Sequence, residues 1–298
     1  MNQQRSTSLH ARDGYWLGAF QAMASPCELL VETDDKALAE HLLQLAANEA
    51  WRIERTFSRY RDDNIIHAIN HNKGKPHKVD AETTQLINFA YQCYELSDGL
   101  FDVTSGVLRK IWTFDGSDRI ASQAQIEACL PFIGLDKAHW QAPYFALPKG
   151  MEIDFGGLAK EYAVDRTLLL LQQQSKASMV VNFGGDMHCS GPRSNGQAWS
   201  VGIEDPSNEA HPHRLLQIHH GALATSGDAR CYLLKDGKRY SHLLNPLTGW
   251  PVECAPRSIT VACETCTEAG MLSTMALLQG KEAEDFLEAQ EVQYWCVR

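Results

Sequence analysis

The sequence predicts an α+β fold in a chain long enough for one large domain or two smaller ones. Of its 298 residues, 44% are hydrophobic and 21% are charged, which is typical of a soluble globular protein with a sizeable core. Strand-like and helix-like segments are mixed along the chain without a regular strand–helix–strand alternation. This mixture favours an α+β arrangement over a doubly wound parallel sheet.

The apolar patterns place the elements in order along the chain. Residues 1–14 are expected to be a mobile lead-in, and residues 15–298 the folded domain. Alternation on both sides of a break at residues 22–26 predicts a hairpin over residues 16–32. Helical spacing predicts helices over residues 34–57, within 57–70, and over 81–98, 120–129, 158–173, 267–278 and 282–289. Further strands are expected at residue 79 and over 144–147, 151–154, 179–183, several segments up to 252, 257–262 and 292–297.

Charge and cysteine content restrict the partners and the compartment. The formal net charge of −10 argues against non-specific binding to nucleic acid or to acidic membranes. The first 20 residues contain no apolar run for a signal peptide, and no later segment approaches a transmembrane span. Nine cysteines, an odd number, favour free thiols in a reducing compartment. We therefore expect a cytoplasmic protein with no nucleic-acid partner and no integral membrane segment.

The stretch MEIDFGGLAKEYAVDR, residues 151–166, is the main candidate for a binding segment. A glycine pair, Gly156-Gly157, precedes a helix whose first N–H groups and positive dipole end favour a phosphate. Lys160 adds a positive charge, and Asp154 can accept a hydrogen bond from a ribose or base, or ligate a metal. An ordinary strand–turn–helix with a buried aspartate explains the same pattern, and the stretch alone does not decide between the two.

Two later glycine-containing segments carry weaker signals. In VVNFGGDMHCSG, residues 180–191, Asn182 could bind a substrate, although a hairpin turn whose aspartate stabilises its own backbone is the better explanation. In ATSGD, residues 224–228, the hydroxyls of Thr225 and Ser226 could surround a phosphate. The flanking pattern of a hydrolase nucleophile is missing, so a serine nucleophile is rejected there.

A histidine and a cysteine pair complete the candidate residues. His242 precedes an Asn-Pro…Thr-Gly turn, where it could serve as a general base, although a lone histidine is more often structural. Cys263 and Cys266 form a CxxC without a second pair, which argues against zinc. A thioredoxin-type role would need this pair at the start of a helix after a strand, and its position permits that.

The order of these motifs resembles that of the ApbE family of FAD:protein FMN transferases. The matching segments are FSRYRDDNIIHAIN, GLFDVTSGVLRKIW, IDFGGLAKEYAVDR, VVNFGGDMHCSG, ATSGD, YSHLLNPLTG and EAGMLSTMALLQG. The resemblance implies a T-fold-like, two-lobed α+β chain with FAD in a cleft between the lobes. It implies transfer of FMN from FAD to a Ser or Thr hydroxyl of an acceptor protein, with release of AMP. A divalent metal, usually Mg²⁺, would assist at the pyrophosphate.

The resemblance also assigns roles to residues by their position in the motifs. Its FAD-binding positions are Met23, Leu100, Phe101, Asp102, Asp154, Lys160, Ser226 and Gly227. The carbonyl of Gly157 and the side chain of Thr274 match metal ligands, and His242 matches the proposed general base.

Gly270 departs from the family pattern at the metal site. The family has an aspartate there, four residues before Thr274, as the only charged metal ligand. A hard cation without that carboxylate should bind more weakly. Magnesium would then depend on the FAD pyrophosphate, or on a substitute such as Glu268, Asp228 or Asp186.

Two further departures accompany Gly270. Asn245 replaces the aspartate of the usual Asp-Pro, and Glu161 replaces a common small residue and adds negative charge beside the phosphate cradle. An FAD-binding or FAD-hydrolysing protein, or a non-catalytic flavin carrier, is therefore an alternative to the transferase.

Overall fold

One antiparallel sheet is the centre of the fold in this computed structural model, which describes residues 5–204, 212–227 and 232–298. Within these residues eight strands pair in the order β1-β2-β3-β7-β8-β11-β14-β15, each antiparallel to its neighbours. Their bounds are β1 Thr7–Arg12, β2 Tyr15–Ala22, β3 Ser25–Val31, β7 Met179–Phe183, β8 Asp186–Cys189, β11 Gly221–Gly227, β14 Ser258–Cys263 and β15 Gln293–Val297. The antiparallel pairing confirms the α+β prediction.

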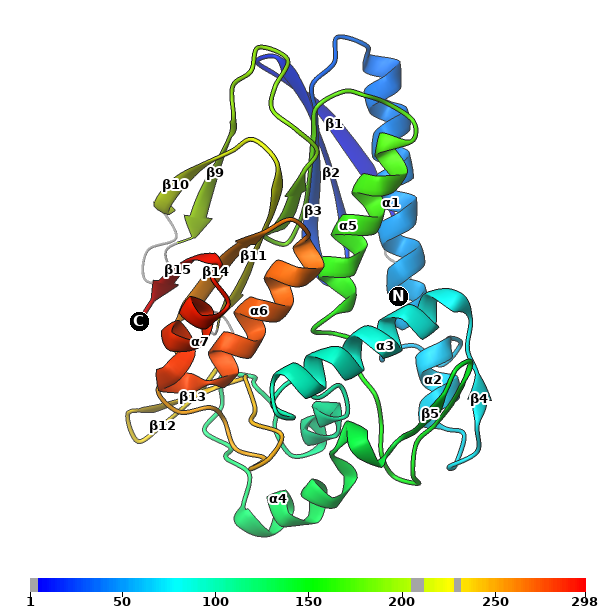
Figure 1. Ribbon diagram of the computed structural model, residues 1–298, viewed down its shortest axis with the longest axis vertical. Coiled ribbons are helices and arrows are strands. Elements are labelled where there is room, and N and C mark those ends of the chain that lie inside the picture. Colours follow the sequence, from blue (N-terminus) through cyan, green and yellow to red (C-terminus); the bar gives the residue numbers. More distant parts are fainter. Residues whose placement is uncertain (1–4, 205–211, 228–231) are drawn as a thin grey trace.

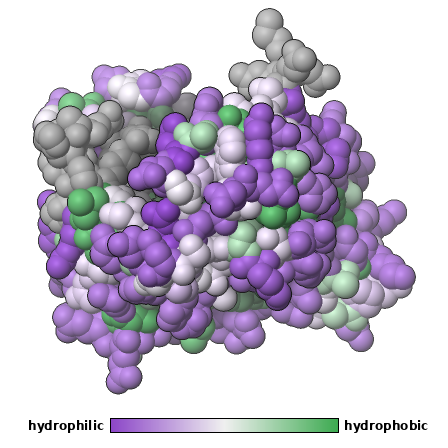
Figure 2. All heavy atoms as spheres, turned by 90° about the horizontal axis from the view of Figure 1, so that it is seen from above, coloured by the Kyte–Doolittle hydropathy of each residue, from purple (hydrophilic) through white to green (hydrophobic). Residues whose placement is uncertain are grey.

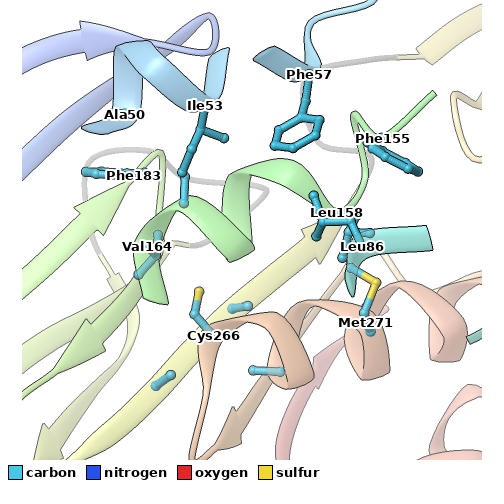
Figure 3. Packing of buried hydrophobic residues seen from close by; sticks show 14 of the residues in the cluster. Ala50, Ile53, Phe57, Leu86, Phe155, Leu158, Val164, Phe183, Cys266 and Met271 are labelled. Atoms are coloured by element: carbon cyan, nitrogen blue, oxygen red, sulfur yellow. The ribbon is translucent and has the colours of Figure 1, made fainter. Parts of the chain in front are cut away.

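Three helices cover one face of this sheet: α1 (Lys36–Phe57), α5 (Ala159–Gln172) and α6 (Cys266–Leu278) (Figure 1). The first helix begins where the side chain of Asp35 accepts hydrogen bonds from the N–H groups of Ala37 and Leu38, at 2.9 and 3.1 Å. Buried apolar side chains from all three helices fill the space between them and the sheet (Figure 3). This layer fixes the position of the N-terminal end of α5.

The other face of the sheet is covered by the hairpin of β9 (Trp199–Glu204) and β10 (Pro212–Ile218). Trp199 and Leu216 pack there against Val180 and Leu223 of the sheet. A central strand buried on both faces needs apolar residues on both sides, which explains the nearly continuous apolar run of β7.

The remaining elements either add to the main core or surround a second, smaller core (Figure 1). They are α2 Ile65–Asn70, β4 His77–Lys78, α3 Ala81–Leu96, η1 Ser105–Lys110, α4 Gln123–Cys129, η2 Leu130–Phe132, η3 Leu135–Lys137, β5 His139–Gln141, β6 Tyr144–Ala146, β12 Tyr232–Lys235, β13 Lys238–Ser241, η4 Gly280–Glu282 and α7 Ala283–Ala289. In the smaller core, Leu108, Ile126 and Leu233 are buried together. Trp112 donates a hydrogen bond from Nε1 to the carbonyl of Gly249 at 2.9 Å, which ties the loop after β13 to η1.

Two expectations about local structure are wrong. The lead-in over residues 1–14 is not mobile throughout, because residues 7–12 form β1 along the edge of the sheet. This strand is polar and mostly exposed, so it lacks the apolar alternation that marks a buried strand. Residues 151–154 belong to no strand. The amide of Asn70 replaces a neighbouring strand there, because it donates to the carbonyl of Ile153 at 3.0 Å and accepts from its N–H at 2.8 Å.

The surface is largely polar where Figure 2 shows it, with apolar residues scattered between hydrophilic ones. Large exposed apolar side chains such as Tyr60, Leu96 and Leu247 come from separate elements. Among the described residues, no helix has both the length and the apolar character needed to cross a membrane.

Candidate functional site

The Gly156-Gly157 loop is anchored by a buried apolar residue on each side. Phe155 and Leu158 are 1% and 0% exposed and point into the main core (Figure 3). The helix α5 starts directly afterwards, and no described side chain caps its first turn. A Cβ added at Gly157 would meet no atom within 4 Å, so this backbone faces open space. The N–H groups of Leu158 and Ala159 donate to the carbonyl of Phe155 at 2.9 and 2.7 Å, so the open space and the positive end of the helix dipole are what favour an anion on that side.

Asp154 supports the glycine loop through two contacts. Its Oδ1 accepts a hydrogen bond from the N–H of Gly156 at 2.9 Å, and its Oδ2 forms an ion pair with Arg59. Burial opposes the charge of Arg59, but Asp154 and Tyr60 raise its pKa, so the guanidinium stays charged. Arg59 is a cation of the site that the sequence analysis did not identify. Nothing in the sequence around Arg59 predicts that its side chain contacts Asp154, which is 95 positions later in the chain.

Lys160 lies on the first turn of α5 and pairs with Asp186 at the start of β8. Its Nζ is 2.6 Å from Oδ2 of Asp186, a close charge contact without the alignment of a hydrogen bond. The other oxygen, Oδ1, accepts from the N–H of Thr225 at 3.0 Å. Burial opposes the charge of Lys160, but Asp186 and Glu161 raise its pKa. The lysine is therefore a fixed positive charge at the helix start.

The turn between β7 and β8 brings a second glycine pair to this place. Gly184 and Gly185 have φ values of 65° and 100°, which glycine adopts without strain. The expectation that Asp186 stabilises this turn is wrong, because Asn182 does so. Its Oδ1 accepts from the N–H of Gly185 at 2.9 Å. The amide nitrogen of Asn182 donates to Glu28 at 3.0 Å, so both ends of this side chain are used within the protein.

The turn between β2 and β3, which contains Met23, lies against the same glycines. A Cβ on Gly184 would be 2.8 Å from Ser25 and 3.9 Å from Cδ of Lys160. The N–H of Met23 donates to Oε1 of Glu54 at 2.8 Å, and this bond holds Met23 at a φ of 51°. The fold thus brings Met23 and Lys160 to the same end of the sheet.

A chain of hydroxyl groups connects the end of β11 to α6. The Oγ of Ser226 lies 2.8 Å from Oγ of Ser273 and 2.9 Å from Oγ1 of Thr274. Ser273 also donates to the carbonyl of Gly270 at 3.0 Å. Residues 224–227 are the end of a strand rather than a turn, and Asp228 lies outside the described residues. The structure therefore brings the predicted residues Ser226 and Thr274 together, through a serine that the sequence analysis missed.

Asp102 fixes the loop that follows Leu100 and Phe101. Its Oδ1 accepts from both the N–H and the hydroxyl of Thr104 at 2.7 Å, and its Oδ2 accepts from the N–H of Leu135 at 3.2 Å. Burial raises the pKa of Asp102, and these hydrogen bonds oppose the rise. Both oxygens have partners in the protein, so Asp102 positions this loop; a direct contact to FAD remains a prediction.

His242 follows β13 and is half-buried. Its ring lies 6.3 Å from the ring of Phe114 in an edge-to-face arrangement, at 78°. Phe114 in turn stacks on Trp112, with ring centroids 6.0 Å apart. The histidine therefore belongs to the wall formed by the smaller core, and its predicted role as a base stays a prediction.

Only the second cysteine of the CxxC pair opens a helix, and neither has the acidity of a redox pair. Cys266 is the first residue of α6, and Cys263 ends β14. Burial raises the pKa of Cys263 to about 12, and it raises that of Cys266 well above its ordinary value. A reactive pair needs a thiolate, so these values disfavour a thioredoxin-type role.

Comparison with known proteins identifies the group to which this site belongs. Residues 23–296 match the model of the ApbE family. The chain belongs to the ApbE family. A relative in Salmonella typhimurium named FAD:protein FMN transferase is 31% identical, over 79% of this chain and 69% of its own. Another of that name in Vibrio cholerae is 30% identical, over 76% of this chain and 69% of its own.

Solved ApbE structures share the fold. The ApbE protein of Thermotoga maritima superimposes with a TM-score of 0.84 and 29% identity, covering 95% of this chain and 94% of its own. The apo form of the flavinyl transferase ApbE of Pseudomonas stutzeri gives a TM-score of 0.84 with 24% identity. The superposition covers 100% of this chain and 93% of that one. At that identity the second likeness shows the fold alone. The predicted ApbE-like α+β fold is confirmed.

Proposed function

We propose that this ApbE family member is an FAD:protein FMN transferase. It would move FMN from FAD to a Ser or Thr hydroxyl of an acceptor protein and release AMP. Relatives that carry this name support the proposal. The observation that carries it is the open loop at Gly157, next to an uncapped helix start and the charged side chain of Lys160.

The diphosphate of FAD fits the helix start because three features there favour an anion. The N–H groups of the first turn have no side-chain cap, Gly157 leaves space, and Lys160 provides positive charge. We place the rest of FAD between this end of the sheet and the smaller core, in the two-lobed arrangement expected for the family. Met23, Leu100, Phe101, Ser226 and Gly227 would line it, with Asp102 and Asp154 holding the adjacent loops.

A divalent metal fits the donor atoms beside this loop. Within the described residues no three His, Cys, Asp or Glu side chains form a metal-binding group. The carbonyl of Gly157 and the hydroxyl of Thr274, which Ser226 orients, are oxygen donors of the kind that Mg²⁺ prefers. When bound, Mg²⁺ would neutralise charge on the pyrophosphate.

His242 would accept the proton of the attacking hydroxyl. A general base must lie within hydrogen-bond reach of that proton, and histidine is the side chain that most often takes this role. Contact with Phe114 orients the ring. The acceptor protein would approach from the same side, and the nine cysteines support a reducing, cytoplasmic location.

Product analysis tests the proposal. The protein is incubated with FAD and MgCl₂, with and without a clarified cell extract as the source of acceptor. Flavin fluorescence in a denaturing gel, peptide mass spectrometry and AMP are then measured. We expect AMP only with extract, in equal amount to FMN bound to Ser or Thr. AMP and free FMN without labelled protein would indicate an FAD hydrolase, and unchanged FAD would indicate a carrier.

A further inference from the structure

Glu161 is a buried carboxyl group that the proposed reaction does not use. It lies on the first turn of α5, next to Lys160, and is 7% exposed. Its Oε2 has no hydrogen-bond partner among the described residues. A buried carboxyl oxygen without a partner is costly, because it loses water and gains nothing in exchange.

The side chain of Glu161 fills the place where a side chain at position 270 would lie. The helices α5 and α6 pack against each other (Figure 1). Gly270 faces Glu161 across this contact. A Cβ built on Gly270 would be 2.4 Å from Cγ of Glu161, 3.1 Å from Cδ and 3.3 Å from Oε1. Glycine at 270 is therefore what leaves room for the glutamate, and the carboxyl group lies where a short acidic side chain on α6 would place its own.

The elements packed around this part of α5 carry three kinds of oxygen donor: a carboxylate, a backbone carbonyl and hydroxyl groups. Asp186, 1% exposed, lies close enough for its charge to raise the pKa of Glu161, together with burial. The carbonyl of Gly270 accepts from Ser273, whose hydroxyl leads on to Ser226 and Thr274. The only ammonium group that these contacts bring to the two carboxyl groups is that of Lys160. Lys160 pairs with Asp186, so these contacts bring no second cation to the buried carboxyl group of Glu161, whose pKa is raised to about 8.

We propose that Glu161 supplies the carboxylate ligand of a divalent-cation site at the contact of α5 and α6, in place of a side chain at position 270. All donors of this site are oxygen atoms, which suit Mg²⁺, Mn²⁺ and Ca²⁺. The site therefore rests on the proposed function only for the choice of Mg²⁺ among these ions. Glu268, a substitute suggested by the sequence, is exposed on α6 and lacks this environment. Asp186 contributes beside Glu161, with one oxygen already held by Lys160.

Titration with Mn²⁺ alone tests this site without FAD or acceptor. Free Mn²⁺ is followed by electron paramagnetic resonance, and the melting temperature with and without Mn²⁺ is recorded for each variant. We expect Glu161→Gln, which keeps the shape and removes the charge, to weaken Mn²⁺ binding by at least about tenfold. It should also abolish the rise in melting temperature caused by Mn²⁺. Glu268→Gln is the matched control and should bind as the wild type does.

A swap variant separates a metal ligand from a structural role. Glu161→Ala combined with Gly270→Asp moves the carboxylate from α5 to α6, and we expect Mn²⁺ affinity within about threefold of the wild type. Glu161→Ala alone should bind as weakly as Glu161→Gln. Wild-type affinity in Glu161→Gln, no recovery in a folded swap variant, or no Mn²⁺ binding by the wild type would overturn the inference. Each result is independent of flavin transfer, so loss of the proposed function would appear separately as unchanged FAD.

Discussion

Lys160 and Asp186 connect the start of α5 to the start of β8 through a contact of 2.6 Å. The carboxyl side of this pair is almost completely buried, at 2% exposure of the side chain, and the lysine side chain is 26% exposed. The lysine charge at the start of α5 is therefore held in place before any ligand arrives. This preorganisation lowers the cost of ordering a long side chain when an anion binds.

Removal of the lysine charge should destabilise the protein. Lys160→Met leaves Asp186 and Glu161 buried without a cation, and loss of one partner of a buried pair costs about 3–5 kcal/mol. Urea denaturation should show this decrease in the free energy of unfolding. Lys176→Met, just past the other end of α5 and exposed, should change it by less than about 0.5 kcal/mol. Equal stability of the two variants would show that the pair does not matter for folding.

A methyl group at position 270 should strain the contact between α5 and α6. Gly270→Ala places a Cβ 2.4 Å from Cγ of Glu161, and overpacking of this kind costs about 1–3 kcal/mol, more than alanine gains in a helix. Most of this loss should disappear when Glu161→Ala is added, because the two changes are coupled. Gly191→Ala, where a Cβ meets nothing within 4 Å, is the control. If the two losses of stability simply add in the double variant, the side chain of Glu161 does not occupy the space beside Gly270.

Acid should weaken the start of α6 through Asp165. Its carboxylate accepts from the N–H groups of Cys266 and Thr267, both at 2.8 Å, and pairs with His188 at 2.7 Å. Burial alone would raise the pKa of Asp165, but hydrogen bonds from His188 and Thr267 hold it below its usual value.

A group whose pKa is lowered by folding stabilises the protein above its unfolded pKa, and the contribution is lost as the pH falls through the folded pKa. The free energy of unfolding of the wild type should therefore exceed that of Asp165→Asn by about 1–3 kcal/mol at neutral pH. This difference should disappear below about pH 4. Parallel denaturation curves from pH 3 to 7 measure this. A gap that stays constant over this range would rule out the carboxylate as its cause.

Loss of the imidazole should affect the chemical step and not FAD binding. His242→Gln should lower the rate of flavin transfer by at least about 100-fold, which is the usual contribution of a general base. FAD affinity, measured by calorimetry, should stay within about twofold of the wild-type value, because a general base acts in the transition state and does not hold the bound FAD. Unchanged labelling of the acceptor would remove His242 from the mechanism.

The sequence predicts those parts of the fold that depend on local pattern. The long helix α1 and the β2–β3 hairpin follow from apolar spacing, and the end of α3 follows from its glycine; all three are present. Gly99, for example, has a φ of 81° and donates to the carbonyl of Tyr94 at 2.8 Å, as a helix-ending glycine does.

The contacts that complete the site depend on residues far apart in the chain, and the sequence does not reveal them. Arg59 reaches Asp154, and the amide of Asn70 replaces a strand beside Ile153. A single sequence shows that Gly270 and Glu161 are unusual, but not that one occupies the space left by the other. Such complementarity is a property of packing between helices, which periodicity does not encode.

Calorimetric titration with FAD in the presence of MgCl₂ tests the central claim, that the diphosphate lies against Gly157 and the start of α5. The wild type is compared with Gly157→Val, whose added side chain meets no protein atom at its Cβ and should leave the melting temperature unchanged. We predict FAD binding by the wild type and a loss of affinity of at least about tenfold in Gly157→Val, because the new side chain takes the place of a phosphate. No binding by the folded wild type, or equal binding by both, would contradict the account.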